Sequence, residues 1–220
     1  MPKAVIFDMD GVLVNSEPVY DAYHQAIAKR LGIIITEEHE RRFRGIPSGT
    51  TYKILVEEFG LSVTADELLK EETAEFCKLF EDGSIPPMPH VFDLLRHLKQ
   101  SGFLIGVATS NYLFNVESIL RLNGAAEHVT QISTMESISR PKPAPDVFLH
   151  AANALQVAPA DCVVFEDSPN GILAAKAAGM KVIGYANPEQ AKLDLSNADR
   201  IIASFDEITA ADVTALLQNA

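Results

Sequence analysis

The 220-residue chain has no tryptophan and only two cysteines, Cys77 and Cys162. The two cysteines lie far apart and show no CxxC spacing, so the sequence predicts neither a disulfide framework nor a zinc site. Cys162 begins a short apolar run, residues 162–165, and is expected to be a core thiol. The cysteine pattern therefore gives no indication of a disulfide-stapled or zinc-binding protein.

The chain also has few basic residues and no apolar run of membrane-spanning length. Lysine and arginine number 18 against 30 acidic residues, which gives a net charge of -12. Such a surface disfavours nonspecific binding to nucleic acid or anionic lipid, because both need a basic patch. Met1-Pro2-Lys3 leads straight into an apolar run, without a visible signal segment. We expect a cytoplasmic protein, a monomer or weak dimer, with neither a nucleic-acid nor a membrane partner.

An apolar run at residues 4–13 contains two carboxylates, Asp8 and Asp10, followed by Gly11. The pattern predicts a buried strand that carries both aspartates to its carboxyl end, where open α/β sheets bind ligands. Two carboxylates so close repel each other and need a cation or a shared proton. An ordinary strand-to-turn junction is the alternative, because Asp and Gly both favour turns.

The rest of the chain predicts two domains. A helix over residues 16–32 is followed by helical periodicity through residues 37–44, 50–59 and 65–80, with no convincing strand. Residues 85–89 hold three prolines and are predicted to be a linker. Beyond them strands and helices alternate, which is typical of a parallel sheet with helices on both faces. We therefore expect an α/β core of residues 1–15 and 88–220, with a helical cap of residues 16–87 inserted into it.

The alternating part of the chain has the following expected elements. Helices are predicted over residues 91–100, 113–122, 146–155, 168–178 and 210–217, and strands over residues 104–108, 129–132, 163–165, 182–185 and 201–203.

A hydroxyl-rich segment, Thr109-Ser110-Asn111, follows the predicted strand 104–108. A hydroxyl at the end of a strand, just before a helix, places a side-chain donor and free backbone amides where an anion can bind. Helix capping by Ser110 or Asn111 is the alternative, and it explains Thr109 less well. We expect Thr109 and Ser110 to bind a phosphate.

Lys142 stands between two prolines in the segment Arg140-Pro141-Lys142-Pro143-Ala144-Pro145-Asp146. The prolines restrict the backbone, so the ammonium group is expected to be held in one direction, and Asp146 is expected to cap the next helix. A surface loop accounts for the prolines but not for a lysine fixed among them. The ammonium would offset the charge that aspartates and a phosphate bring together.

A second buried strand ends in two acids, Glu166 and Asp167, and Ser168-Pro169 then begins a helix. Acidic residues favour a helix N-terminus, but these two precede the cap residue. With Asp8 and Asp10 they would form a cluster of oxygen ligands, which suits Mg²⁺.

These four segments, in this order and each at a strand end, resemble the four motifs of the haloacid dehalogenase-like superfamily, in its sugar-phosphate phosphatase and β-phosphoglucomutase branch. The resemblance covers essentially the whole chain and implies a Rossmann-like core with an inserted helical cap. It implies a magnesium-dependent phosphatase acting on a small phosphorylated metabolite through an aspartyl-phosphate. Asp8 would be the nucleophile, and Asp10 the general acid and then the general base.

The resemblance also implies the remaining roles. Mg²⁺ would be held by Asp8, Asp167 and the backbone carbonyl of Asp10, with Glu166 either a ligand or a partner of one. Thr109 and Lys142 would hold the phosphoryl oxygens.

Asp10 argues against the dehalogenases and phosphonate hydrolases of the superfamily, which lack an acid there. A mutase and a non-catalytic phosphometabolite sensor remain as alternatives. Mutases carry a histidine where this chain has Tyr20 and a lysine where it has Glu71-Glu72. Both differences argue against the mutase interpretation. Met88-Pro89-His90 also stands where the family typically has Pro-Gly, and Asn15 where an aspartate is usual.

Arg41, Arg42 and Arg44 form a basic cluster in the predicted cap. A solvated helix face accounts for the first two, because charge runs usually face water. Arg44 adjoins the glycine-containing loop 45–49 and is the residue we expect to contact a second anionic group of the substrate.

Overall fold

The computed structural model describes residues 2–43, 48–187 and 193–218 of the chain. The chain divides into two compact units, one made of Met1–Asn15 with Pro86–Ala220 and the other of Ser16–Ile85. The predicted cap, residues 16–87, extends two residues beyond the second unit. Of the described helices, none is both long and apolar enough to cross a membrane.

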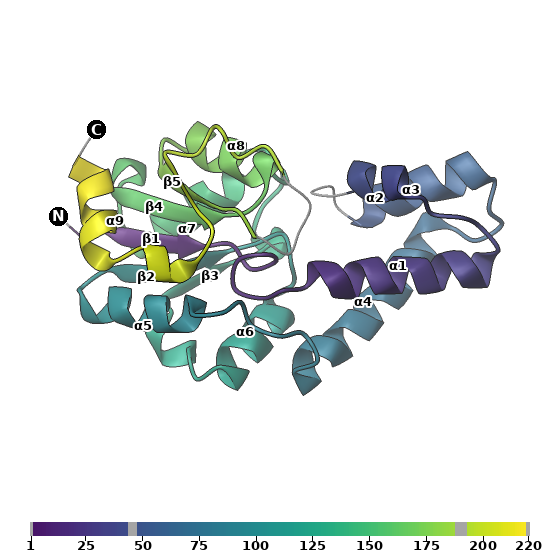
Figure 1. Ribbon diagram of the computed structural model, residues 1–220, viewed down its shortest axis with the longest axis horizontal. Coiled ribbons are helices and arrows are strands. Elements are labelled where there is room, and N and C mark those ends of the chain that lie inside the picture. The colour runs from purple at the N-terminus through teal and green to yellow at the C-terminus, as the bar shows by residue number, and fades with distance from the viewer. Residues whose placement is uncertain (1, 44–47, 188–192, 219–220) are drawn as a thin grey trace. The chain divides into compact units, whose positions relative to one another are not determined.

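The first unit is built on a six-stranded sheet with the order β3-β2-β1-β4-β5-β6 (Figure 1). The strands are β1 (Ala4–Phe7), β2 (Leu104–Ala108), β3 (Gln131–Ser133), β4 (Cys162–Glu166), β5 (Lys181–Tyr185) and β6 (Arg200–Ile202). All five pairings are parallel. In the central register Phe7 lies opposite Val107 of β2 and Phe165 of β4. The carboxyl ends of β1, β2 and β4 therefore meet at one edge of the sheet.

Helices cover both faces of this sheet, which confirms the predicted doubly wound α/β fold (Figure 1). The helices are α5 (Val91–Gln100), α6 (Leu113–Leu122), α7 (Asp146–Leu155), α8 (Pro169–Ala177) and α9 (Ala210–Gln218). Ile6 and Val164 pack with Phe148 of α7 and Ile172 of α8 in one buried core.

The opposite face of the sheet is buried as well. Phe7 and Phe165 stack with their ring centroids 4.9 Å apart, and Phe165 also contacts Phe205 of the short 3-10 helix η4 (Phe205–Glu207). Burial on both faces explains why these strands are continuous apolar runs and lack alternating polar residues. The remaining 3-10 helices are η1 (Ala126–His128), η2 (Met135–Ser137) and η3 (Pro159–Asp161).

The helical unit contains α1 (Glu17–Leu31), α2 (Glu37–Phe43), α3 (Ser48–Phe59) and α4 (Ala65–Asp82), and its described residues include no strand. Ile27, Tyr52, Leu55 and Leu68 are buried in its core. Thr64 forms a capping box with Glu67 at the start of α4. Helix α3 begins at Ser48, so its first two residues belong to the segment predicted to be a loop, residues 45–49.

His90 precedes α5 with φ 64°, a left-handed backbone conformation that favours glycine. This is the place where the resembled family typically has glycine after proline. This conformation is one in which glycine is favoured, and this chain adopts it with a histidine.

The strand predicted over residues 129–132 lies at Gln131–Ser133, later than its apolar residues indicated. Its pairing with β2 sets the shift, because Gly106 to Ala108 pair with Gln131 to Ser133. Ser133 is also buried although it is polar, and its hydroxyl is hydrogen-bonded to His150 Nδ1 at 2.8 Å.

Candidate active site

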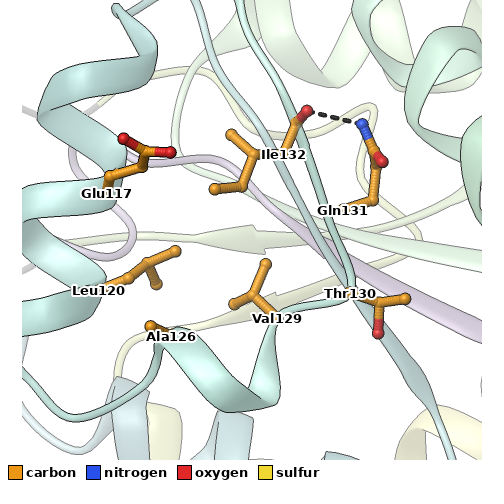
Figure 2. Close-up of a pocket in the computed structure, with 7 residues that line it drawn as sticks. All are labelled: Glu117, Leu120, Ala126, Val129, Thr130, Gln131 and Ile132. Carbon is orange, nitrogen blue, oxygen red and sulfur yellow. Dashed lines mark hydrogen bonds between the residues drawn. The ribbon is translucent and has the colours of Figure 1, made fainter.

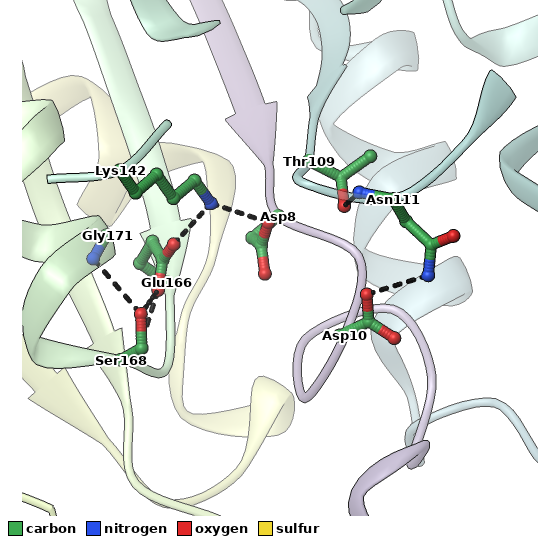
Figure 3. Close-up of polar contacts among 8 residues, drawn as sticks. All are labelled: Asp8, Asp10, Thr109, Asn111, Lys142, Glu166, Ser168 and Gly171. Carbon is green, nitrogen blue, oxygen red and sulfur yellow. Dashed lines mark hydrogen bonds and ion pairs between the residues drawn. The ribbon is translucent and has the colours of Figure 1, made fainter. Parts of the chain in front are cut away.

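The candidate site lies where β1, β2 and β4 end. Asp8 follows β1, and its backbone N–H donates to Phe165 O at 3.0 Å, which continues the pairing with β4 by one residue. Thr109 follows β2, and its N–H donates to Ser133 O at 3.0 Å. The parallel register therefore places Asp8 level with Glu166 of β4, and Thr109 follows the neighbouring strand β2 one residue further on (Figure 3).

Lys142 bridges two of these strand ends, as Figure 3 shows. Its Nζ donates to Asp8 Oδ1 at 2.7 Å and to Glu166 Oε1 at 2.6 Å. Only 10% of its side chain is exposed, and Nζ also lies 4.9 Å from the centroid of the Phe148 ring. The loop of three prolines therefore presents a buried ammonium group to two carboxylates from β1 and β4.

Glu166 is engaged at both carboxylate oxygens. Its Oε2 accepts hydrogen bonds from Ser168 N at 2.8 Å and Ser168 Oγ at 3.0 Å, while Oε1 accepts from Lys142. Ser168 Oγ in turn accepts from Gly171 N at 3.0 Å, which confirms Ser168 as the predicted cap of α8. A Cβ on Gly171 would lie 1.6 Å from Glu166 Oε1, so only glycine fits beside this carboxylate.

Burial and charge shift the proton affinities of this ion cluster. Burial raises the pKa of Asp8 to about 7. The Glu166 charge adds to this rise, and the Lys142 ammonium opposes it only in part. Burial alone would lower the pKa of Lys142, but the charges and hydrogen bonds of Asp8 and Glu166 outweigh burial and raise it. Lys142 therefore stays positively charged at neutral pH and opposes the rise of the Asp8 pKa.

Three carboxylates in the described part of the chain are close enough to share a cation. Each of Asp8, Glu166 and Asp167 offers one carboxylate oxygen, and these three oxygens lie within 4.8 Å of one another. Oxygen ligands of this kind fit Mg²⁺. Gly11, with φ 76°, approaches the same place, since a Cβ on it would lie 1.8 Å from Asp167 Oδ2. The Asp10 carboxylate, which the sequence placed in the cluster of oxygen ligands, is outside this trio, whereas the resemblance assigns only the Asp10 backbone carbonyl to the metal.

Asp10 is half-buried, and a residue that follows β2 holds its carboxylate. Asn111 Nδ2 donates to Asp10 Oδ2 at 3.0 Å, while Asn111 Oδ1 accepts from Tyr112 N at 2.8 Å and Asn115 Nδ2 at 2.7 Å. Asn111 N donates to Thr109 Oγ1 at 3.0 Å. Thr109 is buried and Ser110 is exposed, so only Thr109 belongs to this buried network.

Two predicted helix caps were wrong. The N-cap of α6 is Tyr112, not Ser110 or Asn111, because the Asn111 side chain turns to Asp10 and Glu136 Oε2 accepts from Leu113 N at 2.9 Å. Asp146 is the first residue of α7, and its carboxylate makes two hydrogen bonds to Arg140, so Pro145 occupies the cap position.

Arg44, the residue expected to contact a second anionic group, lies outside the described residues, as does the side chain of Arg41. Arg42 is exposed, and its Nη1 donates to Glu58 Oε2 at 3.3 Å. The described part of the basic cluster therefore forms a surface ion pair.

Sequence reasoning missed two residues that support the site, Asn115 and Glu136. Asn115 holds the Asn111 amide, and Glu136 accepts the first backbone N–H of α6. Neither residue lies in a recognisable motif. Glu136 is 23 residues from its partner, so only the paired strands bring it near.

A separate pocket of about 360 Å³ lies between α6 and the β3 edge (Figure 2). It is lined by Glu117, Leu120, Ala126, Val129, Thr130, Gln131 and Ile132. No lysine, arginine or histidine lines it, and Glu117 adds a negative charge. The pocket is therefore a poor match for a phosphate.

Comparisons with known proteins identify a family and several relatives of this chain. A family model described as haloacid dehalogenase-like hydrolase matches residues 5–185. The chain is 34% identical over 209 residues to validoxylamine A 7'-phosphate phosphatase from Streptomyces hygroscopicus subsp. limoneus, covering 94% of this chain and 96% of that protein. It is 31% identical over 218 residues to hexitol phosphatase B from Escherichia coli, covering 96% of each.

Among solved structures, the chain is similar to CbbY from Rhodobacter sphaeroides in complex with phosphate. The TM-score is 0.84 at 28% identity, and the match covers 97% of this chain and 100% of that one.

Proposed function

This chain belongs to the haloacid dehalogenase-like hydrolase family, which confirms the resemblance seen in its motifs, and from that membership we propose that it hydrolyses a small phosphate monoester. One observation carries the proposal. A buried Lys142 joins Asp8 to Glu166 at the ends of β1 and β4, with Asp10 and Asp167 beside them. Phosphoryl transfer through an aspartyl-phosphate needs a carboxylate nucleophile, a proton carrier and fixed positive charge.

Asp8 is the proposed nucleophile. Its Oδ1 accepts a hydrogen bond from Lys142, and we assign attack on phosphorus to Oδ2. The new bond joins Asp8 to phosphorus while the bond from phosphorus to the substrate oxygen breaks, and Asp10 gives its proton to the departing alkoxide. A water then attacks the phosphorus and loses a proton to Asp10, which releases phosphate and regenerates the Asp8 carboxylate.

The charge of the phosphoryl group requires positive partners. We assign Lys142, Thr109 and Ser110 to bind its oxygens, with the Lys142 ammonium nearest to the nucleophile. Bound Mg²⁺ would supply further positive charge, held by Asp8, Asp167 and the backbone carbonyl of Asp10. Because both Glu166 oxygens already accept hydrogen bonds, from Lys142 and from Ser168, we assign Glu166 to orienting Lys142.

The helical unit supports a phosphatase over a mutase. The Tyr20 ring stacks on Phe76 with centroids 4.1 Å apart, which provides an apolar contact at the position of the mutase histidine. Glu71 pairs with Arg30, and Glu72 is buried with Oε1 3.3 Å from His24 Nε2. Tyr20, Glu71 and Glu72 therefore supply neither the imidazole nor the ammonium that the mutases carry at these positions.

A panel of phosphate monoesters tests the function. Purified protein with Mg²⁺ is expected to release phosphate from sugar and polyol phosphates and from p-nitrophenyl phosphate, and chelation with EDTA is expected to stop release until Mg²⁺ is restored. Conversion of a sugar 1-phosphate to the 6-phosphate without stoichiometric free phosphate would indicate a mutase. Binding of esters with no turnover above that in water would indicate a sensor.

Gly11→Ala is expected to need more Mg²⁺ than the wild type for the same activity. The added methyl group would collide with Asp167 Oδ2, and alanine at φ 76° costs about 1–2 kcal/mol. Gly179→Ala is the matched control, because Gly179 has φ 80° and no atom within 4 Å of its Cβ position. Urea unfolding should show a loss of stability in both variants, whereas the Mg²⁺ concentration for half-maximal activity should rise only in Gly11→Ala. An equal Mg²⁺ response in the two variants would contradict the placement of Asp167.

A further inference from the structure

Asn111 connects two loops that lie far apart in the sequence. It follows β2, whereas Asp10 follows β1, and 101 residues separate them. The Asn111 side chain is buried, and its Nδ2 donates to Asp10 Oδ2 at 3.0 Å (Figure 3). Helix capping, the role expected from the sequence, does not account for this contact, because Asn111 lies before the Tyr112 cap.

The orientation of the Asn111 amide is fixed by its other contacts. Its Oδ1 accepts from Asn115 Nδ2 at 2.7 Å and from Tyr112 N at 2.8 Å. A flipped amide would direct its NH₂ group at these two donors, so the observed orientation is the one that satisfies the hydrogen bonds. The NH₂ group must therefore face Asp10.

The support of this amide is itself rigid. Asn115 is 2% exposed and lies in the first turn of α6, where Leu113 N–H is bound by Glu136. The backbone of Asn111 is bound as well, through its N–H to Thr109 Oγ1. Strand β2 and helix α6 therefore both hold Asn111 in place.

We propose that Asn111, held by Asn115, is a positioning residue that fixes the carboxylate of Asp10 for proton transfer to the leaving group. The inference rests on the proposed phosphatase function. The Asn111 amide donates to Oδ2, which restricts rotation of the Asp10 carboxylate. A carboxylate held in one plane does not have to find this orientation in each turnover.

A badly placed general acid slows the hydrolysis of esters with poor leaving groups most, because these leaving groups depend most on protonation. Asn111→Ala is expected to lower kcat/KM for phenyl phosphate by about 10- to 100-fold and for p-nitrophenyl phosphate, a better leaving group, much less. Asn115→Ala should produce the same pattern more weakly, because Asn111 would keep its contact with Asp10 but lose a support. The measurement is kcat/KM for both esters at one pH with saturating Mg²⁺.

Two further variants keep the test decisive. Asn111→Asp has the same shape and retains an oxygen for Asn115 and Tyr112, but it replaces the donor with a carboxylate that repels Asp10, so it should show at least the loss seen in Asn111→Ala. Asn123→Ala is the matched control, because Asn123 Nδ2 also makes a 2.9 Å hydrogen bond, but to Ile119 O at the other end of α6. This control should lower kcat/KM for both esters equally and only slightly.

The possible results distinguish failure of the positioning role from failure of the phosphatase function. If the wild-type protein hydrolyses p-nitrophenyl phosphate with Mg²⁺ but the Asn111 variants slow both esters equally, or neither, the positioning role is wrong and the phosphatase function stands. If the wild-type protein hydrolyses neither ester, the phosphatase function fails and the positioning role fails with it.

Discussion

Asp8→Asn is expected to lower kcat for every phosphate ester by about 10⁴-fold or more, because the amide cannot attack phosphorus. The side chain keeps its size and one oxygen for the hydrogen bond from Lys142. Burial raises the pKa of Asp8 to about 7, so ionised Asp8 destabilises the fold and a neutral amide in its place removes that cost. The variant should therefore stay folded, with a free energy of unfolding from urea denaturation within about 1 kcal/mol of the wild type.

Phosphate release at saturating p-nitrophenyl phosphate and Mg²⁺ measures this effect. Asp93→Asn is a suitable control, because Asp93 is exposed on α5 and pairs with a surface neighbour, Arg96. It should retain full activity. Normal magnesium-dependent release by Asp8→Asn would exclude the aspartyl-phosphate mechanism.

Lys142→Met is expected to lose activity and also to destabilise the protein by about 3–5 kcal/mol near neutral pH. The variant would leave Asp8 and Glu166 buried together without the cation that now lies 2.7 Å and 2.6 Å from them. Lys176→Met is the control, since the Lys176 pair with Asp199 is partly exposed and should contribute about 0–1 kcal/mol.

The stability loss should depend on pH. The pKa of Asp8 in the fold is raised to about 7, so its contribution to stability is greatest when it is protonated and declines as pH rises through 7. Removing Lys142 raises this pKa further, because the ammonium lowers it. Urea unfolding in EDTA should therefore show a larger deficit for Lys142→Met at pH 8.5 than at pH 6.

A second substitution tests the cause of this instability. Lys142→Met with Glu166→Gln removes one of the two uncompensated charges, so it should recover stability without recovering activity. If Lys142→Met were as stable as the wild type at both pH values, the buried ion cluster would not exist as described.

Local sequence features were enough to predict the secondary structure that surrounds the site. The helices over residues 91–100, 113–122 and 146–155 have the predicted bounds, because amphipathic periodicity is a property of neighbouring residues. The strand at residues 129–132 was displaced, because its position depends on pairing with Leu104–Ala108 and not on its own few apolar residues.

The sequence alone determined that strands buried on both faces would form a parallel sheet, and that Asp8, Asp10, Thr109 and Asp167 would follow strands. Apolar runs and their abrupt ends are local, so they can be read without a fold. Only the tertiary structure decided that β1 lies between β2 and β4, and that Lys142 Nζ reaches Asp8 across 134 residues. It also decided that Asn111 binds Asp10 in place of capping a helix. Such contacts depend on strand order and register, which bring together side chains that are distant in the sequence. They produce no periodic pattern in the sequence itself.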